Sequence, residues 1–327
     1  MRLRATSFAL PDHVVDSKTV AEWSGLQEQF IVEKVGIRSR AFLEKERPID
    51  LAKAACARLA SESGLDFGRI KLLVFVTQNP DFKIPHSSAI LQAELGLGND
   101  VAAFDMNLGC SGFVYALSVT KALMAAEGIP DAMIVTCDPY SRIMDRADRD
   151  TIALFGDAAA ATWLSADAGA EIGRADLGTD GGGAEHLIVR AGGAARPFSA
   201  LYQSAAADEP KRDYRLAMNG RGIFNFMMTR VPASIDRALQ KNGLKLADID
   251  LFAFHQGSRF LLEQVRDKLK LPPEKVIINL ERCGNTVSST IPILLAEQMK
   301  LGGLGGKKVL ISGFGVGLSW ATNILSF

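Results

Sequence analysis

The chain has 327 residues and carries 37 basic and 37 acidic side chains, so its formal net charge is zero. Without a global positive field, the composition does not favour nucleic acid or an anionic membrane surface as a partner. Apolar residues make up 48% of the chain, which suffices for a sizeable buried core in one large domain or two ordinary ones.

Shorter sequence features indicate the cellular location and the state of the cysteines. The amino-terminal segment lacks the long apolar stretch of a secretory signal, and the apolar runs near Leu72 and Val309 are far shorter than the roughly 20 residues of a membrane helix. No two cysteines form a CxxC pair, which argues against a disulfide framework and a zinc site. We therefore expect a reduced, cytoplasmic protein without a metal. The four cysteines are Cys56, Cys110, Cys137 and Cys283.

The first half of the chain predicts a helix followed by strands on either side of a second helix. Small and apolar residues recur at helical spacing in Pro48–Ser63, and a second helical pattern begins near Cys110. Apolar runs of strand length separate these helices. The predicted strands are Lys71–Thr77, Val101–Met106, Asp131–Cys137 and Ala158–Ser165.

The same order returns in the second half, with helices over Gly222–Asn242 and from about Asn285. The chain therefore reads as two copies of one α/β unit, residues 1–170 and 171–327, with mainly parallel sheets covered by helices. The segment Leu177–Tyr214 between the copies is expected to hold a strand, loops and a surface insertion, most mobile at Ser204–Asp213. The predicted strands of the second copy are Leu251–His255, Lys275–Leu280, Lys307–Ser312 and Ser319–Leu325.

Cys110 lies where a strand pattern ends and a helical pattern begins. The first N–H groups of a helix have no partner within it and, with the helix dipole, favour an anion in front of them. We therefore expect the Cys110 thiol to ionise more readily than a free thiol and to act as a nucleophile. A buried structural thiol is the alternative for a lone cysteine. The other three cysteines are interpreted as core thiols.

A thiolate is useful only beside a group that exchanges protons or holds developing charge. His255 and Asn285 each follow an apolar strand-like run in the second copy. The structural alternatives are a packed histidine and an asparagine that serves as a helix N-cap. We expect both side chains to face Cys110 across one shared cavity.

Five segments together resemble the β-ketoacyl-acyl-carrier-protein synthase III type of the thiolase superfamily. The resemblance covers nearly the whole chain, and it implies a five-layered αβαβα fold of two duplicated halves in a protein that is normally a homodimer. It also implies a catalytic set of Cys110, His255 and Asn285. The segments, in family order, are Cys110–Leu117, Asp148–Asp157, Phe254–Gln256, Gly284–Pro292 and Gly313–Gly317.

The implied reaction begins when an acyl thioester transfers its acyl group to Cys110. A malonyl thioester on acyl carrier protein then loses CO₂, and the enolate attacks the acyl group to give a 3-oxoacyl thioester. His255 Nε2–H and the Asn285 amide are the donors expected to hold the charge of decarboxylation. Backbone N–H groups of Cys110 and of the turn from Gly315 to Gly317 are the candidates for a second oxyanion site. No cofactor beyond the thioester substrates is implied.

Four departures from the family pattern concern the site expected to bind acyl-coenzyme A or the carrier. Phe30 replaces a tryptophan that stacks on adenine, and Lys34 replaces an arginine, which loses the flat fork that pairs with phosphate. Arg149 is retained, but the glycine that usually follows it is Asp150. Arg259 is displaced by one position from the family's arginine. The donor is therefore either coenzyme A, more weakly held, or a carrier protein.

The acyl pocket is expected from two further segments. Phe155 matches the family's aromatic near the nucleophile and would exclude water. The segment Pro80–Pro85, with Phe82, Lys83 and Ile84, is expected at the end of the acyl channel, either this chain's or the dimer partner's. Lys83 is either a partner for the far carboxylate of a dicarboxylic acyl group or a solvent-facing lysine at the dimer edge.

Two other functions compete with decarboxylating condensation. In the first, the acyl group on Cys110 passes to an alcohol or amine of a specialised metabolite, with His255 as general base. In the second, the chain is a non-catalytic subunit of a heterodimer, which the intact Cys110, His255 and Asn285 argue against. Release of CO₂ from a malonyl thioester distinguishes condensation from simple acyl transfer.

Overall fold

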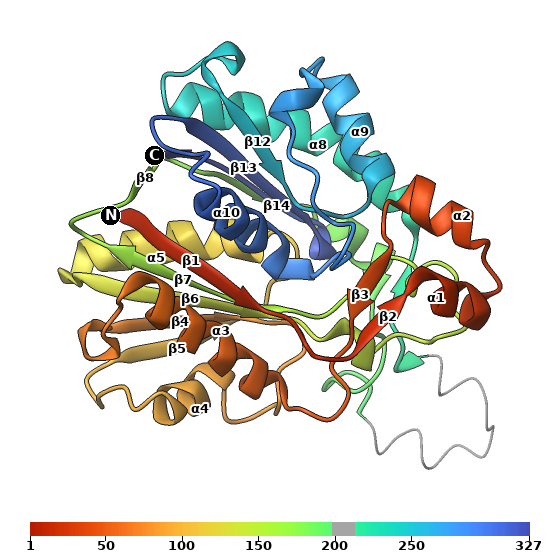
Figure 1. Cartoon of the computed structure of the whole chain (residues 1–327), viewed down its shortest axis with the longest axis horizontal. Coiled ribbons are helices and arrows are strands. Elements are labelled where there is room, and N and C mark those ends of the chain that lie inside the picture. Colours follow the sequence, from red (N-terminus) through yellow and green to blue (C-terminus); the bar gives the residue numbers. More distant parts are fainter. Residues whose placement is uncertain (198–212) are drawn as a thin grey trace.

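The computed structural model describes residues 1–197 and 213–327. Figure 1 shows strands in two layers, with helices α5 (Gly112–Glu127) and α10 (Thr290–Lys300) near the middle and further helices on the two outer sides. In the described part of the chain, every helix is too short or too polar to cross a bilayer.

The first copy contributes five strands in the order β5-β4-β6-β7-β1. β4 runs parallel to both β5 and β6, whereas β7 is antiparallel to β6 and β1. The strands are β1 (Arg2–Ala9), β4 (Leu72–Val76), β5 (Ala102–Met106), β6 (Asp131–Cys137) and β7 (Ala159–Ser165). The helices of this copy, besides α5, are α3 (Pro48–Ser63) and α4 (Ser87–Glu94).

The second copy places β13 between β12, its parallel neighbour, and β14, its antiparallel neighbour. The short β8 pairs with both β14 and β1, so hydrogen bonding is continuous from one copy to the other. The strands are β8 (Ala170–Ile172), β9 (Asp176–Thr179), β12 (Leu251–Phe254), β13 (Lys308–Gly315) and β14 (Ser319–Ser326). The helices, besides α10, are α8 (Gly220–Lys241) and α9 (Arg259–Lys268).

Three apolar clusters define five layers. One packs α3 against the outer face of the first copy's strands, and another packs α8 and α9 against the outer face of the second copy's strands. The third contains residues of α5, α10 and the strands of both copies, so these two helices form the central layer. The prediction of a five-layered αβαβα fold from duplicated halves is confirmed.

Smaller elements lie at one end of the layers, at the right of Figure 1. β2 and β3 form an antiparallel pair, and α1 and α2 lie between them in the sequence. β10 pairs with β11. Their bounds are β2 (Val14–Asp16), α1 (Ser17–Ser24), α2 (Glu28–Phe30), β3 (Ser39–Ala41), β10 (Leu187–Ile188) and β11 (Ala217–Met218).

The predicted helices and strands agree with the structure except for one strand in the second copy. The prediction of mainly parallel sheets is wrong, because β1, β7 and β14 run antiparallel to their neighbours and the sheets are therefore mixed. The predicted strand Lys275–Leu280 is wrong, because only a single bridge, Phe252 to Val276, ties this segment to a strand. Hydrogen bonds of the Gln256 side chain to the backbone of Ile277 and Asn279 hold the segment instead. The predicted insertion Ser204–Asp213 lies outside the described residues apart from its last residue.

Candidate active site

Cys110 lies in the turn between β5 and α5 and is 5% exposed. Gly315, at the end of β13, packs directly against it: a Cβ built on Gly315 would be 2.9 Å from the Cys110 Sγ. Gly315 has an extended backbone (φ 167°), so the close approach and not the backbone conformation requires glycine here.

Two backbone N–H groups, those of Cys110 and Val316, lie close enough to the Cys110 sulfur to favour its ionised form. Val316 lies within the turn from Gly315 to Gly317, the segment in which the sequence places its candidate oxyanion donors. At Gly317 the backbone conformation favours glycine, because the residue is left-handed (φ 119°). Close packing does not require glycine there, since a Cβ would meet only Ser319 atoms, at 3.9 Å. The two N–H groups form a pair of donors beside the sulfur.

The expected acidity of the Cys110 thiol is wrong. Burial raises its pKa to about 12, the nearby Asp138 carboxyl raises it as well, and the two N–H groups only partly oppose them. The helix-terminus argument neglected the loss of hydration on burial, which disfavours the charged form. Cys110 therefore rests as a thiol, and its chemistry requires a base that accepts the proton.

His255 follows β12 and is 3% exposed. Its Nδ1 lies 2.8 Å from the Thr290 hydroxyl oxygen, and that hydroxyl lies 3.2 Å from the Val287 carbonyl oxygen. Burial lowers the pKa of His255 to about 3, while a hydrogen bond to the Val287 backbone opposes the shift. Because the Thr290 hydroxyl donates to the Val287 carbonyl, its oxygen is left to accept the Nδ1–H of the ring. The neutral ring then presents an unprotonated Nε2 as a base.

Asn285 is 5% exposed and is fixed from both sides. Its backbone N–H donates to Leu154 O at 2.9 Å and its carbonyl accepts from Gly156 N–H at 3.0 Å. Its side-chain Oδ1 accepts the Val287 N–H at 2.9 Å, which leaves the amide Nδ2 as a donor. The alternative of a helix N-cap is wrong, because Ser289 occupies that position of α10.

Contacts between neighbouring residues bring the three predicted catalytic residues to one place. Gly109, next to Cys110, approaches Val287: a Cβ built on the glycine would be 3.4 Å from a Val287 methyl carbon. On the other side, Phe314 precedes Gly315 and meets the His255 ring edge-on, with ring centres 5.8 Å apart. Cys110 from the first copy therefore faces the donors of the second copy.

The buried wall next to Cys110 includes residues that the sequence interpretation missed. Phe155, which was predicted, is 2% exposed, and its ring centre lies 5.1 Å from that of Tyr140. The Tyr140 hydroxyl donates to Gln78 Oε1 at 2.8 Å. Gln78 ends the segment Ile70–Gln78, whose sequence is similar to that of Ile249–Gln256 in the second copy. The internal repeat was therefore a usable signal for Gln78, whereas no sequence pattern marked Tyr140.

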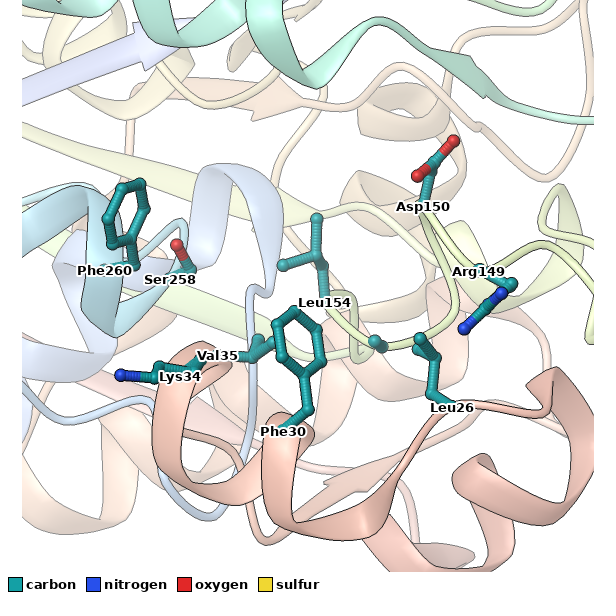
Figure 2. A pocket seen from close by; sticks show the side chains of 10 residues that line it. Leu26, Phe30, Lys34, Val35, Arg149, Asp150, Leu154, Ser258 and Phe260 are labelled. Atoms are coloured by element: carbon teal, nitrogen blue, oxygen red, sulfur yellow. The ribbon is translucent and has the colours of Figure 1, made fainter.

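A cavity of about 840 Å³ lies beside this site (Figure 2). Phe30 and Phe260 stand on opposite sides of it, from α2 and α9, and the charged residues are Lys34, Arg149 and Asp150. Three of the four residues predicted to bind coenzyme A or carrier thus line one cavity. Its lining residues are Leu26, Phe30, Lys34, Val35, Arg149, Asp150, Ala153, Leu154, Ser258 and Phe260.

The remaining predicted residues lie elsewhere. Arg259 does not line this cavity, and its side chain packs on Gly36. Phe82 and Ile84 are 54% and 85% exposed, on the loop between β4 and α4. Lys83 donates a hydrogen bond to the Gly192 carbonyl of its own chain. These loop residues do not belong to the buried wall around Cys110 of the same chain.

Family models of 3-oxoacyl-[acyl-carrier-protein (ACP)] synthase III match residues 104–181, and of its C-terminal part residues 239–327. The β-ketoacyl-[acyl-carrier-protein] synthase III of Lactococcus lactis subsp. lactis is 32% identical over 322 residues, covering 97% of this chain and 96% of that protein. The chain belongs to the synthase III family. Cys110 thus lies in one matched segment, and both His255 and Asn285 lie in the other.

Solved structures agree with this assignment to the synthase III family. A crystal structure of 3-oxoacyl-(acyl-carrier-protein) synthase III superposes with a TM-score of 0.94 at 36% identity, covering 100% of this chain and 99% of the other. The 3-oxoacyl-(acyl-carrier protein) synthase of Burkholderia xenovorans LB400 gives 0.89 at 32% identity, covering 99% and 93%.

Proposed function

We propose that this protein catalyses the decarboxylating condensation of an acyl thioester with a malonyl thioester through an acyl group on Cys110. The observation that carries the proposal is the convergence on Cys110 of two donor sets. The N–H groups of Cys110 and Val316 lie beside the sulfur and favour its negative charge. His255 and Asn285 belong to the second copy and are the second donor set. Membership of the synthase III family supports the same reaction.

In the first half-reaction, Cys110 attacks the acyl carbonyl while its proton moves from Sγ to His255 Nε2. Neutral His255 suits this step because its Nδ1 already carries the proton that the Thr290 hydroxyl oxygen accepts. The tetrahedral oxyanion lies between the Cys110 and Val316 N–H groups. The C–S bond of the donor then breaks, and its thiolate leaves with the proton from His255 Nε2, because an imidazolium of pKa about 3 is far more acidic than a thiol.

In the second half-reaction, the malonyl C–C bond breaks and CO₂ leaves, so negative charge grows on the thioester oxygen. Nδ2–H of Asn285 holds that charge, together with a proton that His255 Nε2 takes up from water as the charge grows. The enolate carbon attacks the acyl carbonyl and the bond to Sγ breaks. The Cys110 thiolate recovers its proton from Nε2, which restores the resting thiol and neutral imidazole.

Intact-mass spectrometry and CO₂ release together test the proposal. The protein should gain one acyl group from acyl-coenzyme A, and Cys110→Ala should not. The acylated protein should then release CO₂ from malonyl thioester and form 3-oxoacyl product. Acylation followed by transfer to an alcohol or amine without CO₂ would instead favour the acyltransferase, and absence of any adduct would favour the non-catalytic subunit.

For the donor, we propose that the phosphopantetheine arm common to coenzyme A and acyl carrier protein occupies the cavity of about 840 Å³. Two features of this cavity support the proposal. The cations Lys34 and Arg149 favour an anionic ligand, and the exposed rings of Phe30 and Phe260 favour one that is partly aromatic or extended. A carrier protein and coenzyme A both supply the phosphate. Competition between acyl-coenzyme A and acyl carrier protein in the acylation assay distinguishes them.

We further propose a homodimer that pairs through β5. This strand has a partner only on its β4 side among the described strands, and its residues are less buried than those of β4. A free sheet edge favours pairing with another strand. The exposed Phe82 and Ile84 on the adjoining loop would then contact the partner subunit. Light scattering of the purified protein tests the dimer, and a monomeric mass would contradict it.

Two remaining proposals follow from the same features. We divide the chain at residue 170, which is supported by β8 beginning there and linking the strands of the two copies. A cytoplasmic location is supported by four free, buried cysteines. Limited proteolysis tests the division, and cell fractionation tests the location.

A further inference from the structure

Asp138 is a buried carboxyl group that the proposed reaction does not use. It follows β6 directly and is 0% exposed. Its oxygens accept the Gln78 N–H at 2.7 Å and both the N–H and the hydroxyl of Ser288. Among the described residues no cation forms an ion pair with it, so these three donors compensate the loss of its hydration.

The Ser288 that Asp138 holds lies in a strained turn. Val287 has a φ of 54°, in the left-handed region that a β-branched residue rarely adopts, and its side chain is 0% exposed. Such a conformation typically costs about 1–3 kcal/mol and persists only where surrounding contacts enforce it. Ser289, the residue after Ser288, is fixed by a 2.7 Å hydrogen bond to Thr136 of β6, the strand that Asp138 follows.

This turn orients the donors of the second half-reaction. The Val287 N–H bonds to the Asn285 Oδ1 at 2.9 Å and so aims the amide Nδ2. The Val287 carbonyl accepts from Thr290, whose hydroxyl contacts His255 Nδ1. Asn285 has no other side-chain hydrogen bond among the described residues, whereas His255 is also fixed by its strand and by Phe314. The amide therefore depends most on the turn.

We infer that Asp138 is a positioning residue for decarboxylation: by holding the strained turn at Val287 and Ser288, it aims the Asn285 amide at the thioester oxygen. The inference rests on the proposed function. A carboxyl group of the first copy thus fixes a donor of the second copy, 147 residues further along the chain.

The test compares Asp138→Asn with Asn285→Ala and with the double variant. Because misplacing a donor by about 1 Å costs about 10²-fold, CO₂ release and condensation should fall roughly 10²-fold in Asp138→Asn, mainly in kcat. Acylation of Cys110 should fall less than about threefold, because its oxyanion donors lie outside the turn and loss of the Asp138 charge removes one cause of the raised pKa of the thiol. The double variant should be no slower than Asn285→Ala, because both changes remove the same interaction.

Two further variants control for folding. Asp131→Asn removes a buried carboxylate at the opposite end of β6, where it bonds to Arg69 and Trp163, and should leave both half-reactions unchanged. Ser288→Ala removes one hydrogen bond to the carboxylate but leaves the two from backbone N–H groups, so it should slow condensation less than Asp138→Asn, roughly tenfold. It supplies the test if Asp138→Asn does not fold.

The outcomes separate the inference from the proposed function. If CO₂ release is normal in the Asp138 and Ser288 variants but lost in Asn285→Ala, the inference alone is overturned. An equal loss of acylation and condensation, or additive losses in the double variant, overturns it too. No CO₂ release from the unmodified protein overturns the proposed function, and the inference with it.

Discussion

The resting state of the nucleophile gives the sharpest test of the site. With its pKa raised to about 12, Cys110 at pH 8 is ionised in only about one molecule in 10⁴, whereas an ordinary cysteine of pKa 9.0 is ionised in about one in ten. The difference of three pKa units corresponds to about 4 kcal/mol. Higher intrinsic nucleophilicity of the more basic thiolate recovers a factor of roughly 10–30, so we expect alkylation about 30–100-fold slower than that of a free thiol.

The assay is the rate of iodoacetamide addition to Cys110 between pH 6 and 10, followed by intact mass and peptide mapping, with Cys110→Ala as the blank. Restricted access scales the rate equally at every pH, so the shape of the profile is diagnostic. The logarithm of the rate should rise with a slope near one and show no plateau. A plateau below pH 8 would refute the argument, because it would mean a thiolate stabilised by the helix end or by an imidazolium.

Three further predictions follow from single positions. Gly315→Ala places a Cβ 2.9 Å from the sulfur and displaces the Val316 donor, so acylation should fall roughly 10²–10³-fold, while Gly305→Ala, with nothing within 4 Å, should be neutral. Asp150→Gly removes a negative charge from the cavity, so the KM for acyl-coenzyme A should fall roughly threefold at low salt, and a difference that persists in high salt would contradict this. Burial raises the pKa of Asp157 to about 6, above its unfolded value of 3.8, so the folded state binds the extra proton and stability falls as pH rises from 4 to 6; calorimetry should show this fall reduced by about 3 kcal/mol in Asp157→Asn.

The fold was predictable because its repeated elements carry strong local signals. Helix Pro48–Ser63 has proline at its first position and is followed by the left-handed Gly64, and strand Asp131–Cys137 is an apolar run, buried at every residue. The segment Lys275–Leu280 has a similar apolar pattern but follows two prolines, and its backbone is held by a side chain, Gln256. An apolar pattern alone does not reveal which partner satisfies the backbone.

The residues of the proposed site could be chosen from the sequence, but their electrostatics could not. Cys110, His255 and Asn285 stand out because each follows a strand-like run, and Gly315 because its segment matches a family motif. The acidity of Cys110 depends on burial and on Asp138, neither of which a linear pattern records. The charge state of a buried group follows from what surrounds it in three dimensions.

The duplication itself explains why the two donor sets meet. Cys110 and Asn285 occupy corresponding places, each just before a helix of the central layer, α5 in one copy and α10 in the other. Packing these helices together brings their first turns into contact, as Gly109 and Val287 show. One copy then supplies the sulfur and the other the charge-holding donors, so neither copy alone forms the proposed site. Changes at contacts between the copies, such as Asp138 to Ser288, therefore act on chemistry as much as on stability.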